Sequence, residues 1–385
     1  MSADKRKDPP SPPTQNGVVI KRQKQENKEE SSSAVALSSS SATGKNLVVG
    51  TIKRTSGLQA PVMLLNGHQG DVYTCEFDPS GQHIASGSFD RQICKYAWVG
   101  RDDTYHYLNT NRHEPVLWNT YGDCVNYGMM KGHTNAILEL HWAKDAKQIY
   151  TCSADQTLGI WDVETGERVR KWKGHSLVVN SCGVSRNTPE LVVSGSDDGC
   201  IKLWDAREKN AVETFQDDFQ VTAACFSDAG DMVFTGGIDN VIKAWDLRKK
   251  AVAYTLSGHA DTITGIKLSP DGSYLLSNSM DNTTRMWDVK PFAPADRGVK
   301  TFEGAPHGYE KNLIRPCWSP DGNQIASGSS DRSVVIWEVS SRKILYKLPG
   351  HKGCVNDVDW HPKEPIIVSG STDKSLYLGE VKPTQ

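Results

Sequence analysis

The sequence repeats an aspartate followed six residues later by a tryptophan, and this repeat limits the possible folds more than any other feature. From Asp155 to Asp373, successive aspartates of the repeat are 43, 41, 42, 50 and 42 residues apart. A period of roughly 40 to 50 residues is typical of chains in which each repeat forms one blade of a β-propeller. The complete pairs are Asp155 and Trp161, Asp198 and Trp204, Asp239 and Trp245, Asp281 and Trp287, and Asp331 and Trp337.

A histidine precedes most of these aspartates by 22 to 24 residues, usually directly after a glycine. A serine stands two residues before each of the same aspartates. A buried carboxylate needs hydrogen-bond donors, and an imidazole N–H and a hydroxyl can supply them. The histidines are His68, His133, His175, His259, His307 and His351; the serines are Ser88, Ser153, Ser196, Ser279, Ser329 and Ser371; the aspartates are Asp90, Asp155, Asp198, Asp281, Asp331 and Asp373.

The segments between these positions have the character of short β-strands. Residues 71–77 alternate between apolar and polar side chains, and residues 191–194 and 200–204 are rich in β-branched and aromatic residues. Turn sequences such as 269–272 and 319–322, both Ser-Pro-Asp-Gly, separate such segments. Each repeat has room for four strands, so the sequence predicts an all-β fold.

The sequence resembles the WD-repeat family of β-propellers. The resemblance rests on four Trp-Asp dipeptides, which begin at Trp161, Trp204, Trp245 and Trp287, together with the Gly-His dipeptides, and it covers about residues 58–381. It implies a seven-bladed propeller over residues 58–383. It also implies that the histidine, the serine, the aspartate and the tryptophan of each repeat join in one hydrogen-bond network, which accounts for these side chains without a catalytic or metal site.

Two repeats depart from this pattern. The fourth repeat has no Gly-His dipeptide in residues 215–221, and Gly237 replaces the serine, so we expect that blade to be held mainly by packing. The seventh repeat has Gly379 at the tryptophan position and room for three strands only. Residues 61–65 precede a Gly-His dipeptide as residues 343–348 do, so the N-terminal segment should supply the missing outer strand. This strand would close the ring and leave no open sheet edge.

The first repeat contains an insertion. Asp90 is followed by Trp118 after 28 residues instead of six, which indicates about 22 extra residues near 94–115 in the first blade. An alternative takes 92–98 as the strand, with Tyr96 at the tryptophan position and Trp118 in a loop. We favour Trp118 as the strand residue. The insertion is then either a binding loop or the product of an unusual splice or gene model.

Residues 1–57 are rich in Ser, Pro, Lys and Gln and have few large apolar side chains, so we expect a disordered tail. The tail has ten basic and five acidic residues, which leaves a net charge of −7 for the remainder of the chain. Its two basic clusters have the spacing of a bipartite nuclear localisation signal and predict a nuclear protein. The clusters are Lys5, Arg6 and Lys7, and Lys21, Arg22 and Lys24.

Composition and motifs exclude several classes of function. The net charge of −2 and the acidic propeller argue against direct RNA binding. There is no apolar run of membrane-spanning length, and the nine cysteines form no CxxC pair. The chain has no G-x-S-x-G, P-loop or H-E-x-x-H motif. We therefore predict no catalysis, no cofactor, no metal and no small-molecule substrate.

Several segments also resemble a narrower family, the WD-repeat proteins of the U5 small nuclear ribonucleoprotein. Some of them lie in loops, where blade architecture does not dictate the residues. The resemblance implies a scaffold in the spliceosome, which takes part in pre-mRNA splicing, contacts the large core splicing factor of the U5 particle and associates with RNA indirectly. The segments are 58–65, 121–124, 165–169, 272–278, 291–294, 310–313 and 343–351.

A second function remains open, that of a substrate receptor for a cullin-RING ubiquitin ligase. Its basis is the pair of W-D-x-R motifs at Trp204 and Trp245, which are similar to motifs by which some propellers dock a ligase adaptor. The structural explanation is that Asp246 and Arg248 pair at a blade edge.

The residue before each network aspartate should lie at an exposed turn. Three of these residues are large and apolar: Phe89, Ile238 and Met280. Apolar side chains grouped on one face are typical of protein interfaces, so we expect these three to bind partners. The alternative is that they pack against neighbouring loops.

Overall fold

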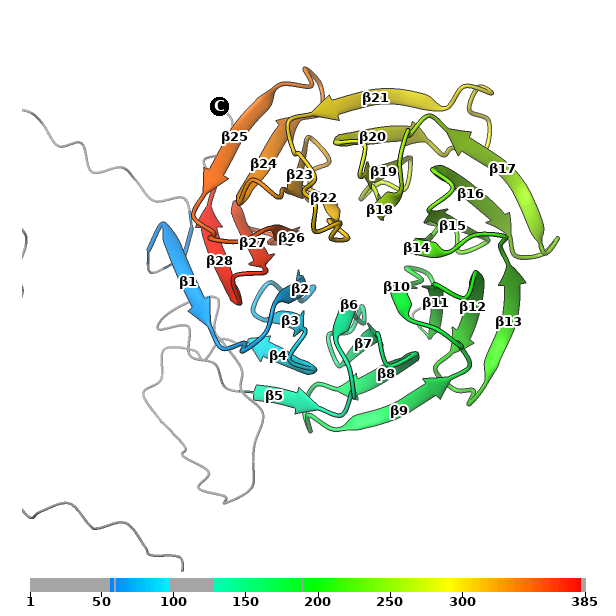
Figure 1. Ribbon diagram of the computed structural model, residues 1–385, viewed down its shortest axis with the longest axis horizontal. Helices are drawn as coiled ribbons and strands as arrows, with labels where there is room; N and C mark the ends of the chain where they lie inside the picture. Colours follow the sequence, from blue (N-terminus) through cyan, green and yellow to red (C-terminus); the bar gives the residue numbers. More distant parts are fainter. Residues whose placement is uncertain (1–55, 59, 97–127, 189, 382–385) are drawn as a thin grey trace, which may run out of the picture. The chain divides into compact units, whose positions relative to one another are not determined.

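The computed structural model describes residues 56–58, 60–96, 128–188 and 190–381, which belong to one compact unit spanning 53–385. Their regular structure is entirely β, with 28 strands in seven four-stranded sheets. The sheets stand around a central axis like the blades of a fan (Figure 1). The predicted seven-bladed β-propeller is confirmed. In the described part of the chain, no helix is long and apolar enough to cross a membrane.

Each blade is a meander whose first strand lies nearest the axis and whose last strand lies at the rim (Figure 1). Blade 1 contains β2 (Val72–Phe77), β3 (Ile84–Ser88), β4 (Gln92–Tyr96) and β5 (Gly128–Lys131); blade 2 contains β6 (Ile137–Trp142), β7 (Gln148–Ser153), β8 (Thr157–Asp162) and β9 (Arg168–Lys173); blade 3 contains β10 (Val179–Val184), β11 (Leu191–Ser196), β12 (Cys200–Asp205) and β13 (Ala211–Gln216).

The remaining blades follow the same order. Blade 4 contains β14 (Val221–Phe226), β15 (Met232–Gly237), β16 (Val241–Asp246) and β17 (Ala251–Ser257); blade 5 contains β18 (Ile263–Leu268), β19 (Tyr274–Ser279), β20 (Thr283–Asp288) and β21 (Gly298–Glu303); blade 6 contains β22 (Pro316–Trp318), β23 (Gln324–Gly328), β24 (Ser333–Glu338) and β25 (Ile344–Pro349); blade 7 contains β26 (Val355–Trp360), β27 (Ile366–Ser371), β28 (Ser375–Glu380) and β1 (Val62–Asn66).

Burial explains the order of the strands in a blade. All six residues of β27 are buried, because a neighbouring blade packs on each face of this strand. The rim strand β13 alternates between exposed and partly or fully buried residues, since one of its faces meets water. The core lies between blades: Tyr150 and Leu158 of blade 2 belong to the same apolar cluster as Val192 and Trp204 of blade 3. Each such side chain contributes roughly 1.5 to 3 kcal/mol by leaving water.

The first strand closes the ring. β1 pairs antiparallel with β28, and Leu65, which faces Leu376 in this pairing, is fully buried. The last blade is therefore built from both ends of the propeller, as the sequence predicts. Without this pairing, β28 would present an unpaired edge.

The register of blade 1 shows that the preferred assignment of Trp118 is wrong. In blade 2, Trp161 on the third strand faces Ile149 on the second, and in the first blade Tyr96 of β4 faces Ile84 of β3 at the same position. The alternative with Tyr96 at the tryptophan position is the observed one. Cys94 lies within β4, so extra residues cannot begin there; the strand continues through Tyr96. Trp118 and most of the predicted insertion lie outside the described residues.

The pairing of β4 and β5 predicts which residues blade 1 can lose. Lys95 faces Gly128, so a short connection is enough to join the two strands. Deleting residues 99–124 leaves five linking residues, and we expect the melting temperature to change by less than about 3 °C. Deleting residues 94–115 removes three of the five residues of β4 and should abolish the cooperative transition. Calorimetry on both variants tests this; loss of the transition in the first would contradict the assignment.

Candidate functional site

The repeated histidines and aspartates meet at the turn between the second and third strands of five blades. In each blade, the imidazole Nδ1 lies within hydrogen-bond distance of the aspartate carboxylate. This contact joins the loop that precedes the blade to the turn inside it. The distances are 2.9 Å for His68 and Asp90, 3.0 Å for His133 and Asp155, 3.0 Å for His175 and Asp198, 2.9 Å for His259 and Asp281, and 3.0 Å for His351 and Asp373.

The hydroxyl that meets the imidazole is not the predicted one. Nε2 lies on the side of the imidazole opposite the aspartate. It therefore contacts the second-strand residue that stands two positions before the predicted serine. Its partners are Ser86, Thr151, Ser194, Ser277 and Ser369, at 2.7 to 2.9 Å. The predicted serines instead accept the backbone N–H of the aspartate and shape the turn; they are Ser88, Ser153, Ser196, Ser279, Ser329 and Ser371.

In blades 2, 3 and 5, a tryptophan completes the network. Trp287 Nε1 donates to Ser277 Oγ at 2.8 Å, and Trp161 and Trp204 make the same contact with Thr151 and Ser194. Burial lowers the pKa of His259, which therefore remains neutral near pH 7. The proton positions follow from the network: the indole donates to the hydroxyl, the hydroxyl to Nε2, and Nδ1–H to the carboxylate.

Blade 4 replaces the histidine with an ion pair. Asp217 occupies the position 22 residues before Asp239, and Lys243 Nζ lies 2.6 Å from Asp217 and 2.7 Å from Asp239. Trp245 still donates to Thr235 Oγ1 at 2.8 Å. The expectation that packing holds this blade was therefore incomplete, because a lysine between two aspartates provides the link that the imidazole provides elsewhere.

Blade 6 does not use His307 in the predicted way. Asp331 pairs with Lys347 Nζ at 2.5 Å, and Trp337 Nε1 donates to the backbone oxygen of Glu303 at 2.9 Å. The backbone N–H of His307 donates to Asn282 Oδ1 at 2.6 Å, and His307 Nε2 lies 3.3 Å from Asn278 Nδ2, so both contacts tie this histidine to blade 5. The prediction of His307 as a network member is wrong, because the longer connection before β22 places it beside the preceding blade.

The network predicts that the hydroxyl in contact with histidine Nε2 contributes measurably to the free energy of unfolding. Replacing Ser277 with Ala leaves the Trp287 N–H and His259 Nε2 buried without their partner, which should lower the free energy of unfolding by about 1 to 3 kcal/mol. Urea unfolding measures the change. Ser340→Ala, at an exposed turn, is the control and should have no effect. Equal stability of the two variants would refute the role of the hydroxyl.

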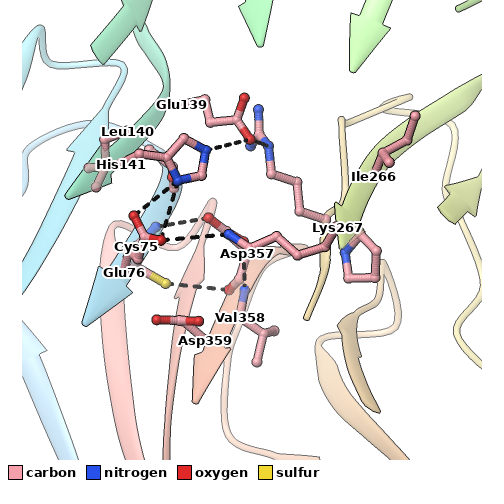
Figure 2. Close-up of a pocket in the computed structure, with 13 residues that line it drawn as sticks. Cys75, Glu76, Glu139, Leu140, His141, Ile266, Lys267, Asp357, Val358 and Asp359 are labelled. Carbon is pink, nitrogen blue, oxygen red and sulfur yellow. Dashed lines mark hydrogen bonds and ion pairs between the residues drawn. The ribbon is translucent and has the colours of Figure 1, made fainter. Parts of the chain in front are cut away.

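A second cluster, which the sequence analysis missed, lies where the inner strands approach the axis (Figure 2). Glu139 Oε1 lies 2.9 Å from Arg315 Nε, and His141 lies 3.1 Å from Glu76 and 3.6 Å from Glu139. Lys267 Nζ lies 3.6 Å from Glu76. No sequence motif indicates this cluster, because its members come from blades 1, 2 and 5 and from the residue before β22.

Arg315 crosses the axis and contacts several blades. Its Nη1 donates to the backbone oxygen of Tyr73 in blade 1 at 3.2 Å, and its Nη2 donates to that of Asn180 in blade 3 at 3.3 Å. Burial alone would raise the pKa of Glu139, but the Arg315 guanidinium and His141 lower it to about 2. Both ions therefore remain charged, and the side chains hold inner strands together.

Blade 7 adds two carboxylates to this central cluster. Asp357 accepts the backbone N–H of Cys75 at 3.0 Å, and Asp359 accepts that of Phe77 at 2.8 Å, so both link β26 to β2. Burial, with the nearby charge of Glu76, raises the pKa of Asp359 to about 7. This carboxyl therefore titrates near neutral pH.

The central cluster suits neither a substrate nor a metal ion. Its free space of about 10 Å³ is the size of one water molecule. Glu139, His141 and Cys182 lie close enough to share an ion, with ligand atoms within 4.8 Å of one another. However, both nitrogens of His141 face carboxylates, and Glu139 is held by Arg315 and by the N–H of Cys182. The ligands are thus already occupied, and the neighbouring cations would repel a metal.

The raised pKa of Asp359 predicts that alkaline pH weakens the fold. Its protonated form is favoured by folding, so this contribution is complete below about pH 4 and is lost as the pH rises through about 7. Asp359→Asn removes the titration and should raise the free energy of unfolding at pH 8 by roughly 1 to 3 kcal/mol, with no gain at pH 4. Urea unfolding at both values checks this. Asp218→Asn, an exposed control, should change neither; the same gain at both values would contradict the assignment.

The predicted partner-binding residues lie on one face of the ring. In a four-stranded meander, the turn after the second strand and the loop that enters the next blade lie on the same side. The N–H of Phe89 donates to Asp71, that of Ile238 to Gln220 and that of Met280 to Thr262, which ties each turn to such a loop. Phe89 is 56% exposed and Ile238 is 43% exposed, whereas Met280 is half-buried.

Two further apolar side chains on this face were not predicted, since they lie in the entering loops. Leu177 is 47% exposed and Phe219 is 48% exposed. The Phe219 loop contacts the turn of blade 3 at Gly199 and, through Gln220, the turn that holds Ile238. Leu177, Phe219 and Ile238 therefore follow one arc over blades 3 and 4, which we call the apolar arc.

The W-D-x-R motifs lie on the opposite face. The guanidinium of Arg207 pairs with Asp205 of its own motif at 2.8 Å, and the Arg207 side chain is largely exposed. Asp246 accepts the backbone N–H of Arg248 at 2.9 Å and lies 3.5 Å from Lys249 Nζ. These contacts stabilise the turn after the third strand, and an adaptor is not needed to explain them.

Comparison with known proteins agrees with the blade geometry. The family described as WD domain, G-beta repeat matches seven segments of the chain: 59–96, 124–162, 166–205, 210–246, 251–288, 306–338 and 342–378. The chain belongs to the WD-repeat family. The first segment stops at residue 96, where β4 ends, and the second resumes at 124, which agrees with Tyr96 rather than Trp118 as the strand residue.

The chain is also similar to individual proteins over most of its length. It is 50% identical to the U5 small nuclear ribonucleoprotein 40 kDa protein of Homo sapiens over 86% of each chain. It is 45% identical to the protein of the same name from Dictyostelium discoideum, over 89% of this chain and 90% of that one. It is 41% identical to pre-mRNA-splicing factor cwf17 of Schizosaccharomyces pombe, over 86% of this chain and 90% of that one.

Proposed function

We propose that this propeller is a non-enzymatic scaffold of the U5 small nuclear ribonucleoprotein that takes part in pre-mRNA splicing. The supporting observation is the identity of 41 to 50%, over nearly the whole propeller, to proteins named for U5 or for splicing in Homo sapiens, Dictyostelium discoideum and Schizosaccharomyces pombe. Similarity of this extent includes loops, where a generic propeller would differ.

The internal chemistry supports a scaffold rather than an enzyme. In the described residues, five imidazoles of the repeat contact an aspartate and a hydroxyl inside a blade, so they have no free nitrogen for catalysis. The central cluster has room for about one water molecule. What remains for function is the surface of a rigid ring, which binds other proteins.

The proposal includes partners and a compartment. We propose that the large core splicing factor of the U5 particle is a direct protein partner, that RNA is associated through proteins, and that the chain acts in the nucleus. The basic clusters proposed as the import signal, at Lys5, Arg6, Lys7, Lys21, Arg22 and Lys24, lie outside the described residues.

For docking we propose the face that holds Phe89, Ile238 and Met280, extended by the apolar arc. The exposed side chains Phe89 and Ile238 lose apolar surface to water if a partner covers them, which favours association. Met280 contributes less, because it is already half-buried.

Affinity isolation of the tagged full chain from nuclear extract tests the proposal. U5 RNA and splicing proteins should be recovered with the wild type. Phe89→Asp and Ile238→Asp together should reduce their recovery at least about tenfold, since a charge at a buried apolar contact costs more than 1.4 kcal/mol. Phe292→Asp is the matched control, because Phe292 is 99% exposed on the opposite face.

The outcomes distinguish the candidate functions. Recovery of a cullin adaptor without U5 RNA would replace the splicing proposal with the ligase alternative. Recovery of U5 RNA that the double variant does not reduce, while both variants melt cooperatively, would retain the splicing role and refute the docking face.

A further inference from the structure

The rim strand of blade 5 lacks a side chain that the corresponding strands of other blades provide. In the backbone register, the residue that faces the blade tryptophan is Arg168 in blade 2, Ala211 in blade 3, Val252 in blade 4 and Ile344 in blade 6. In blade 5 the residue that faces Trp287 is Gly298. The missing side chain leaves space beside the indole at the outer edge of the ring, where β21 lies (Figure 1).

This space is a recess of about 310 Å³, bounded by β20, β21 and the turn before β25. A Cβ atom built on Gly298 would lie 3.5 Å from Asp296 Oδ1 and 3.7 Å from the ring of Trp287, which are ordinary contact distances. A larger side chain at position 298 would therefore enter the recess without backbone strain. The volume is enough for a charged group together with part of the residue that bears it.

Three cations line the recess, against one carboxylate. Arg285 comes from β20, Lys300 from β21 and Arg342 from the turn before β25, and the carboxylate is that of Asp296. Lys300 Nζ donates to the backbone oxygen of Val339 at 2.6 Å, which ties the two blades together. The charged side chains that line the recess thus have a net charge of +2, on a propeller that is otherwise acidic.

Neither arginine of the recess is within salt-bridge distance of a carboxylate in the part of the chain that the structure describes. Arg285 Nε donates to Thr283 Oγ1 at 3.4 Å. Its Nη1 lies beside Gly258, where a Cβ atom added to the glycine would be only 2.9 Å away. In blade 2, the guanidinium of Arg168 lies in the same place beside Gly132 but donates to its backbone oxygen at 2.7 Å. The guanidinium of Arg285 therefore stands at the recess with hydrogen-bonding capacity remaining.

We infer that this recess, which we call the rim site, binds a phosphorylated side chain of a partner protein. A guanidinium offers two parallel N–H donors that match the oxygens of a phosphate, and Lys300 and Arg342 add positive charge. Asp296 accepts one N–H from Gly298 at 3.2 Å and can accept a peptide N–H of the partner. The rim site is separate from the docking face of the proposed function and does not depend on it.

The shape of the rim site favours a peptide over RNA. A nucleic-acid backbone needs cations that follow a row of phosphates, whereas these cations converge on one recess of a propeller with net negative charge. The outer edge of β21 is also the unpaired edge of its sheet, next to which an extended peptide can lie.

Fluorescence anisotropy on the full chain tests the rim site. The probe is a fluorescein-labelled degenerate peptide mixture with a central phosphoserine, and the comparison mixtures contain serine or glutamate at that position. We expect the phosphoserine mixture to bind at least tenfold more tightly than the serine mixture. Arg285→Gln should reduce this affinity at least tenfold, and Gly298→Leu should do the same by filling the recess while retaining all charges. Arg248→Gln, an exposed arginine in blade 4, is the control and should have no effect.

The variants and competitors keep the result interpretable. Melting temperatures show whether each variant is folded; if Arg285→Gln unfolds, Arg342→Gln and Gly298→Leu decide the question. Equal affinity for the phosphoserine and serine mixtures would overturn the inference, as would unchanged binding in folded Gly298→Leu. A uridine oligonucleotide that binds more tightly than the phosphoserine mixture would overturn it in favour of RNA. A glutamate mixture that binds as well as phosphoserine would overturn phosphate as the recognised group.

Discussion

The propeller depends on satisfying a carboxylate at a turn that every blade must make. A buried carboxylate without donors costs more than a blade can gain from a few apolar contacts, so its partners are built into the same repeat. In blade 5 the hydrogen bonds run from Trp287 through Ser277 and His259 to Asp281. They connect the second strand, the third strand and the entering loop, so one set of side chains fixes the geometry of a whole blade. Blade 4 reaches the same end with a lysine between two aspartates, which shows that the requirement is a donor at this place and not an imidazole as such.

The number of blades, their order and the ring closure could be predicted from the sequence, because the repeat fixes the register of aspartate, histidine and tryptophan. Details within a repeat could not. Ser277 and Ser279 are on the same strand and differ by two residues, so both face one side, and only the position of the imidazole nitrogen distinguishes them. Residue type favours Trp118 at the tryptophan position, whereas the strand register follows the six-residue spacing from Asp90 and selects Tyr96.

The sites that the sequence concealed are those assembled from different blades. Arg315 lies beside Glu139 only because the ring brings the inner strands to one axis, and these two residues are far apart in the chain. The rim site could not be predicted for another reason. The missing side chain at Gly298 is recognised only when the strand register places this residue opposite Trp287. The tryptophan and aspartate repeat describes how each blade is held together, while differences between blades distinguish this propeller from others.

The pairing of β1 with β28 also sets the order of events during synthesis. Among the strands of the propeller, β1 leaves the ribosome first, yet its hydrogen-bond partner β28 is made after all the others. Until then, residues 62–66 have no neighbour in the sheet to which they belong, and the earlier blades stand as an open arc. The ring of a nascent chain therefore stays open until β28 has been made, and a chain cut short before residue 375 leaves residues 62–66 without a strand to pair with.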